Sequence, residues 1–343
     1  MLNREYQVVL HFFSSDGTSL GQSPVEIDYE PAREWTRLRA IRQGRMPAAL
    51  AGATESIHPV WSVPIGEPYL KGFRVDLSFG DGVASCDFHV SYFKGLAHDV
   101  SSGYVKRGSL KEGDRFLFLA AAVPADPAAR RRPALALTTE EILPPLPIRE
   151  TPLAGFGCGI EFAGPSTERE FPVFIPRPVL NEAEDLSRAS GAVETGGVLI
   201  GHLHRDPSIP EAFLEITAQI PARHTVGEKA SLTFTPDTWA DARAAINRRG
   251  RNEIAAGWWH FHPVQAWCDT CPPEKKHDCT LACSFFSEQD RKLHRVVFPA
   301  AHSVALVVNA IGAGSMTHSL FGWREGSISA RGFYQIDAPV TVR

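Results

Sequence analysis

The sequence has little that points to a membrane or to a nucleic-acid partner. Its 343 residues carry a formal net charge of −4, and the pI is near 6.4, so no basic field favours DNA or RNA. The most apolar runs, around 116–125 and 303–311, are about ten residues long, well below the ~20 needed to span a bilayer. The start, MLNREYQVVLHFF, has no small-residue cleavage site of a signal peptide. We therefore expect a cytoplasmic protein that binds neither membranes nor nucleic acids.

Cysteine is scarce as well, but it is not scattered. The chain has six cysteines, and four of them fall between positions 268 and 283. In a reducing compartment thiols stay free, so clustered cysteines indicate a metal site before a disulfide.

The length is typical of two domains, and composition changes along the chain. Residues 1–122 form a β-rich N-terminal domain of unknown function, in which the alternation of Phe73–Phe79 is that of a half-buried strand. Residues 123–153 are proline-rich and are expected to be a linker. The other elements expected before the linker are strands at Tyr6–Phe13, Asp87–Phe93 and Arg115–Leu119, and a helix around Pro31–Gln43.

The remaining residues, 154–343, mix helices and strands without strict alternation, which predicts an α+β fold. One helix is well marked: Thr235 is placed to cap it, Pro236 to start it and Gly250 to end it. Asn181 is expected to cap a second helix over 181–189. The expected strands are Phe171–Pro176, Val193–Gly201, Ala212–Ile220, Glu253–Phe261 and Ser303–Ala310.

Two histidines at the end of a predicted strand are candidate metal ligands. In Gly257-Trp-Trp-His-Phe-His-Pro263, His260 and His262 are two residues apart, so both imidazoles point to the same face of the strand. Converging neutral imidazoles suit zinc above other first-row metals. Such a pair alone is weak evidence, because many are polar residues on an exposed face.

Two acidic segments could complete a hydrolytic centre. Ser287-Glu-Gln-Asp290 reads as a helix cap close to a capping box, and Asp290 could equally be a third zinc ligand. Glu194 precedes the glycine-rich apolar run TGGVLIG, where a buried carboxylate costs several kcal/mol unless it is paired or functional. Beside a metal site it would act as a general base and then as an acid.

The three segments, ETGGVLIG, then HFHP, then SEQD, together resemble the JAMM (MPN-plus) zinc metallopeptidases over about residues 171–335. The resemblance implies a curved mixed sheet flanked by helices in the C-terminal domain. It implies that His260, His262 and Asp290 bind a catalytic zinc, and that Glu194 activates the water. Ser287 would stabilise the oxyanion of the tetrahedral intermediate.

The family also implies a substrate class. Its members include deubiquitinating isopeptidases and their bacterial relatives, so we expect cleavage after the C-terminus of a ubiquitin-like protein, in deconjugation or precursor processing. An added N-terminal domain fits a bacterial ubiquitin-like conjugation system, such as one used in antiviral defence, with activating- or conjugating-enzyme-like partners. Processing of a sulfur-carrier-type ubiquitin-fold protein, general peptidase activity and a non-catalytic MPN-type scaffold are the alternatives.

The sequence departs from the family in a cysteine-rich insertion at 264–286. Residues 263–286 separate His262 from Ser287, where the family usually has seven residues. The insertion holds Cys268, Cys271, Cys279 and Cys283 as C-x2-C-x7-C-x3-C, a pattern that predicts a second, structural zinc. His277 is a possible substitute ligand, and a disulfide or free thiols are the alternatives.

For two further histidines and two tryptophans, the sequence predicts only a location in the fold. His202 and His204 follow Gly201 and are interpreted as polar loop residues. Of Trp258 and Trp259, one is expected to pack in the core and the other to face a groove.

Overall fold

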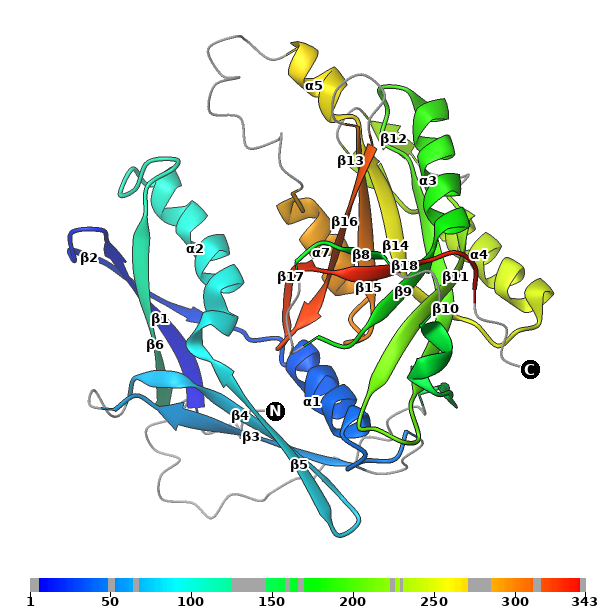
Figure 1. The fold of residues 1–343 in the computed structure, drawn as a ribbon. Coiled ribbons are helices and arrows are strands. Elements are labelled where there is room, and N and C mark those ends of the chain that lie inside the picture. Colours follow the sequence, from blue (N-terminus) through cyan, green and yellow to red (C-terminus); the bar gives the residue numbers. More distant parts are fainter. Residues whose placement is uncertain are drawn as a thin grey trace. The chain divides into compact units, whose positions relative to one another are not determined.

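The computed structural model describes residues 6–48, 53–63, 68–124, 146–157, 161–165, 170–222, 226–228, 231–270, 285–310 and 316–339. The chain divides into two compact units (Figure 1). The first comprises residues 1–40 and 45–145, and the second comprises 41–44 and 146–343. Within the described residues, no helix has the length and apolar character that a membrane crossing requires.

The first unit contains two three-stranded antiparallel sheets, ordered β2-β1-β6 and β3-β4-β5. A bridge between Tyr69 and Ala121 connects them. Two α-helices and one 3-10 turn accompany the sheets. The elements are β1 (Tyr6–Ser14), β2 (Ser19–Val25), α1 (Glu30–Arg42), β3 (Thr54–Trp61), β4 (Leu70–Phe79), β5 (Gly82–His89), η1 (Val90–Phe93), α2 (Lys94–Lys106) and β6 (Phe116–Pro124).

The alternating pattern in β4 is confirmed, since Phe73, Val75 and Leu77 are all buried. Phe73 stacks on Phe88 of the neighbouring strand, with ring centroids 5.1 Å apart. The expected strand Asp87–Phe93 is wrong in its second half. The chain leaves β5 after His89, whose side chain accepts a hydrogen bond from the Ser91 amide and so caps a 3-10 turn.

The second unit is built on a ten-stranded mixed sheet, with the order β17-β16-β15-β14-β10-β11-β9-β18-β8 and β7 paired to β10. Its strands are β7 (Ile148–Glu150), β8 (Glu161–Ala163), β9 (Val173–Pro176), β10 (Gly196–Arg205), β11 (Ala212–Pro221), β14 (Ile254–His262), β15 (Val304–Ala310), β16 (Met316–Arg324), β17 (Ser327–Arg331) and β18 (Phe333–Ile336). A separate hairpin pairs β12 (Val226–Glu228) with β13 (Ser231–Thr233). The other elements are η3 (Leu153–Phe156), α3 (Arg177–Ser190), α4 (Pro236–Arg249), α5 (Val264–Thr270) and α7 (Glu288–Val297).

This unit is α+β, as the mixed pattern predicts. The sheet is strongly curled, because β17 and β18 follow each other along the chain yet lie far apart in the strand order. Strand β7 and the first residue of η3, Leu153, fall within the range 123–153 that is expected to be linker. The short run Ile148–Glu150 pairs in parallel with the end of β10 and so belongs to the sheet.

The helices cover both faces of the sheet. Gln219 of β11 links Trp259 of β14 to Glu182 of α3 by hydrogen bonds, so α3 covers one face. On the other face, Ala242 of α4 packs against Val198 of β10. Helix α7 also lies on that face, where it supplies Leu293 and Val297 to the core.

The ends of helices α4 and α3 show which local sequence signals were sufficient to predict where a helix begins and ends. Helix α4 begins and ends as predicted, with the Thr235 side chain accepting from the Thr238 amide and Gly250 in the left-handed conformation at φ 62°. The predicted start of α3 at Asn181 is wrong. The helix begins at Arg177 with Pro176 as its N-cap, because a proline within the first two positions already has a helical φ.

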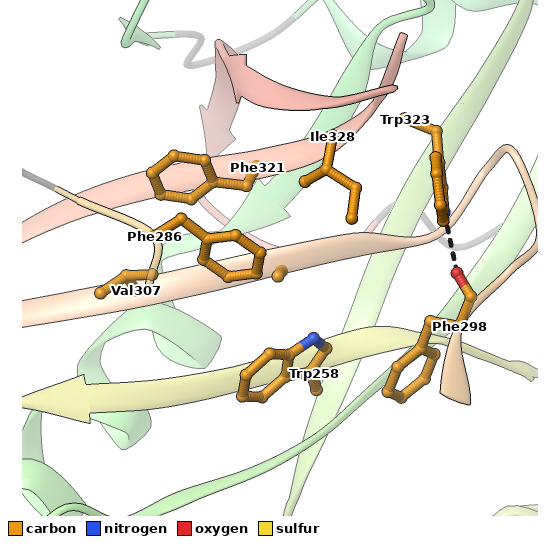
Figure 2. Close-up of a cluster of buried hydrophobic side chains, with 8 residues drawn as sticks. Trp258, Phe286, Phe298, Val307, Phe321, Trp323 and Ile328 are labelled. Atoms are coloured by element: carbon orange, nitrogen blue, oxygen red, sulfur yellow. Dashed lines mark hydrogen bonds between the residues drawn. The ribbon is translucent and has the colours of Figure 1, made fainter. Parts of the chain in front are cut away.

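A hydrophobic cluster of the second unit packs against Leu293 and Val297 of α7. Figure 2 shows its buried side chains. Trp258 of β14 packs there with Phe286, Phe321 and Trp323, and the Trp323 indole donates to the Phe298 carbonyl at 2.8 Å. The expectation that one tryptophan of the Trp258–Trp259 pair faces a groove is wrong, because the two are 1% and 0% exposed. Adjacent strand residues point to opposite faces, and both faces of this central strand are covered.

The interpretation of His202 and His204 as loop residues is also wrong. Strand β10 continues to Arg205, and both histidines are buried in it. The two ring nitrogens of His204 lie within hydrogen-bonding distance of Thr151 and Glu215, at 2.9 and 3.2 Å. These partners supply the polar contacts that burial requires.

A candidate metal centre

Strand β14 carries the two histidines to a single point at its C-terminal end. His260 and His262 are 0% and 2% exposed. Their Nε2 atoms lie 2.8 Å apart, because side chains two residues apart on a strand share a face. The predicted convergence of the two imidazoles is therefore present.

Helix α7 brings a carboxylate to the same point. Ser287 caps the helix, its Oγ accepting from the Asp290 amide at 3.1 Å, while the Ser287 amide donates to Asp290 Oδ2 at 2.8 Å. This reciprocal pair is the predicted capping box with aspartate at its third position. It fixes the carboxylate so that Oδ1 lies 3.4 Å from His260 Nε2 and Oδ2 lies 3.9 Å from His262 Nε2.

The three side chains fit a small metal ion. Their ligand atoms all lie within 4.8 Å of one another. Tetrahedral zinc with bonds of 2.0–2.1 Å needs ligand atoms about 3.3 Å apart, and the observed separations of 2.8, 3.4 and 3.9 Å bracket that value. Two nitrogens and one oxygen also suit zinc chemically, and three protein ligands leave a fourth position for water.

Protonation states also suit metal binding. Burial and the nearby His260 lower the pKa of His262 to about 3, so its ring is neutral at neutral pH. Burial raises the pKa of Asp290, but the charge of His260 and hydrogen bonds with His260 and Ser287 outweigh this effect and lower it to about 2. A neutral imidazole and an ionised carboxylate are the forms that bind a metal.

Glu194 lies next to this group. The Phe261 amide donates to the Thr195 carbonyl at 2.8 Å, and Gly196 pairs with His260. The antiparallel register therefore places Glu194 opposite His262 and on the same face. Burial raises the pKa of Glu194 to about 7, with the Asp290 charge adding to the increase and His260 opposing it.

The glycines after Glu194 have a separate, structural role. A Cβ on Gly201 would lie 1.9 Å from the Glu215 carbonyl oxygen, and one on Gly197 would lie 2.5 Å from the Ile220 carbonyl oxygen. Strands β10 and β11 therefore approach too closely there for any other residue.

Aromatic rings enclose the histidines. Trp258 stacks on His260 with centroids 4.5 Å apart, and its indole donates to His294 Nδ1 at 3.1 Å. Phe285 stacks on His262 at 4.5 Å, and Trp267 of α5 lies 5.3 Å from the same ring. Phe285, His294 and Trp267 were not identified from the sequence, because nothing in their spacing links them to the histidines.

Only part of the cysteine cluster can be described. Cys268 lies on α5, half-buried, six residues after His262. Cys271, Cys279 and Cys283 lie outside the described residues, as does the substitute ligand His277. The second zinc therefore remains a prediction.

Comparisons with known proteins assign no family to this chain. No family profile matches it. No curated protein matches it either. Among solved structures it is similar to the solution structure of protein DSY2949 from Desulfitobacterium hafniense. The TM-score is 0.34 and the identity 14%, over 49% of this chain and 94% of that one. A likeness at this level does not bear on function.

Proposed function

We propose that this protein is a zinc-dependent peptidase of the JAMM (MPN-plus) type. The observation that carries the proposal is the convergence of His260, His262 and Asp290, with the buried Glu194 in register beside them. A structural metal site would need no titratable carboxylate with a raised pKa at its edge. Perturbed acids near such a donor set are typical of hydrolytic centres.

A zinc ion at the three ligands would polarise the scissile carbonyl and lower the pKa of a coordinated water toward 7. Glu194 would take the proton released when water adds to the carbonyl carbon. Without metal, burial raises its pKa to about 7. A zinc cation nearby would lower that pKa, so Glu194 would be ionised and able to accept a proton near neutral pH. It would pass that proton to the leaving nitrogen as the C–N bond breaks, and so return to its ionised state.

Ser287 would act on the oxygen of the tetrahedral intermediate. Its Oγ accepts the Asp290 amide through a lone pair, and this hydrogen bond does not use the hydroxyl proton. The hydroxyl can therefore donate to a developing oxyanion. The capping box holds the donor in place before substrate arrives.

For the substrate, we propose the C-terminus of a ubiquitin-like protein, cleaved from a conjugate or a precursor. This class rests on the resemblance of ETGGVLIG, HFHP and SEQD to the family. A bacterial ubiquitin-like conjugation system, such as one in antiviral defence, would supply the substrate and the activating- or conjugating-enzyme-like partners. We also propose a structural zinc at Cys268, Cys271, Cys279 and Cys283, supported by their spacing.

The test is cleavage of candidate ubiquitin-like fusions by the full chain, with and without a chelator. Glu194→Gln should lower turnover by a factor of about 10² to 10⁴, the usual contribution of a general base, and should keep its zinc. Glu288→Gln, on an exposed position of α7, is the matched control and should cleave like the unaltered protein. Unchanged turnover in Glu194→Gln would refute the mechanism. Zinc binding without cleavage of any candidate would favour the non-catalytic scaffold.

A further inference from the structure

One buried polar side chain beside the metal centre has no role in the chemistry described so far. Asn309 lies on β15, which runs parallel to β14, and it pairs with His262 in the register. Directly paired residues of neighbouring strands point to the same face of a sheet. The Asn309 side chain therefore projects on the same side as the His262 ring. It is 1% exposed and interrupts an otherwise apolar strand, VALVVNA.

The polar atoms in this place are unsatisfied. Among the described residues, Nδ1 of His262 and both amide atoms of Asn309 are buried without a hydrogen bond of ordinary geometry. Leaving a buried polar atom without a hydrogen bond costs about 1–3 kcal/mol, so the presence of these three atoms in the core requires an explanation. Because Asn309 is the residue of β15 paired with His262, the two unsatisfied side chains lie side by side on one face of the sheet.

We propose that Asn309 is a positioning residue that fixes the metal-binding tautomer of His262, its Oδ1 accepting a hydrogen bond from Nδ1–H when Nε2 binds the metal. The inference rests on the metal centre of the proposed function. The tautomer follows from the chemistry of the ring, because a neutral imidazole has one protonated nitrogen and one unprotonated nitrogen. Nε2 points at Asp290 and His260. The proton must therefore sit on Nδ1, and it needs an acceptor.

Among the described residues, the other neighbours of the His262 ring do not supply that acceptor. Glu194 lies opposite His262 in the register, but its carboxylate interacts with His260 and Asp290 on the Nε2 side. Phe285 stacks on the ring, and the Trp267 ring is tilted against it; neither side chain has a hydrogen-bond acceptor to offer. Asp290 and His260 lie on the Nε2 side. Asn309 pairs with the histidine on the same face of the sheet, and its amide oxygen accepts. Partners of this kind orient a metal-binding histidine and typically contribute 10–100-fold to metal affinity.

The experiment measures metal affinity in the full chain, independently of any substrate. Zn²⁺ and Co²⁺ dissociation constants are measured by competition with a chromophoric chelator for unaltered protein, Asn309→Leu, Asn309→Asp and Ser329→Ala. The Ser329 hydroxyl is also buried without a partner among the described residues, but it lies on β17, away from the metal ligands. Ser329→Ala therefore controls for the removal of an unsatisfied polar atom.

We expect Asn309→Leu to bind Co²⁺ and Zn²⁺ 10–100-fold more weakly, and to unfold in chelator no more easily than the unaltered protein. Asn309→Asp retains an acceptor and should keep the affinity within a few-fold. In the Co²⁺ form, the exchangeable Nδ1–H proton of His262 should give a shifted NMR signal that Asn309→Leu loses.

The outcomes separate the two proposals. If the unaltered protein binds no metal at the centre, the proposed function and this inference both fail. If it binds metal and Asn309→Leu has the affinity of Ser329→Ala, only the inference fails. Weakening of Asn309→Asp to the level of Asn309→Leu would also refute it, since a carboxylate accepts the same hydrogen bond.

Discussion

Asp290 has two roles in the structure, and a pair of variants can separate them. Its carboxylate accepts the Ser287 amide at 2.8 Å in the capping box and also faces both histidines. Ser287→Ala removes the cap but none of the three proposed ligands. Asp290→Ala removes a ligand and leaves the Ser287 amide without its acceptor.

The two substitutions should have similar effects in the absence of metal. Loss of the Ser287 cap costs about 1 kcal/mol, within a range of about 0.5–2. Loss of the Asp290 acceptor costs about 1–3 kcal/mol, because the Ser287 amide is half-buried. Both variants should therefore unfold somewhat earlier than the unaltered protein in a chelator.

Zinc should distinguish them sharply. At a free zinc concentration of about 1,000 times the dissociation constant, binding stabilises the folded state by about 4.1 kcal/mol. Ser287→Ala should keep this increment, and Asp290→Ala should lose most of it. Zinc at the cysteine cluster would stabilise all three proteins alike, so only the difference between the variants reports on Asp290.

The assay is thermal or urea unfolding of each protein with zinc and with chelator, comparing the two conditions within a variant. Because the chain has two units, midpoint shifts are compared instead of a single fitted free energy. Equal zinc-dependent shifts in Ser287→Ala and Asp290→Ala would show that the carboxylate is not a ligand. A smaller shift in Ser287→Ala than in Asp290→Ala would contradict the assignment of both residues.

Two further predictions concern the sheet and the cysteines. Gly201→Ala should destabilise the protein by about 1–3 kcal/mol or more, because the new Cβ would lie 1.9 Å from the backbone oxygen of Glu215. The control is Gly155→Ala, whose Cβ would have no neighbour within 4 Å. Equal midpoints of the two variants in urea unfolding would contradict the argument. Metal analysis of the purified chain should give two zinc ions, and the double change Cys268→Ser with Cys271→Ser should leave one; an unchanged count would exclude the four-cysteine site.

Local chemistry determined the elements that the sequence predicted well. Thr235, Pro236 and Gly250 each act within one turn of helix, and α4 follows them at both ends. The Ser287–Asp290 capping box is equally local. The pair His260 and His262 needed only the two-residue period of a strand.

Features that depend on distant partners were missed. His202 and His204 look like loop residues until Thr151 and Glu215 are known to satisfy the second of them. Asn309 acquires meaning only from the parallel pairing of β15 with β14. The sequence placed Glu194 at the site by family resemblance, whereas the physical reason is the antiparallel register of β10 and β14.

The position of β18 has a consequence for how the second unit folds. This strand lies between β9 and β8, and its partners Phe174 and Phe162 are more than 150 residues earlier in the chain. During synthesis, β9 must therefore wait with an unpaired edge until almost the whole unit has left the ribosome. Such long-range pairing slows folding and exposes a strand edge to other chains. Cutting the chain before Phe333 would leave that edge open permanently, so a truncated unit should aggregate even with its complete metal centre.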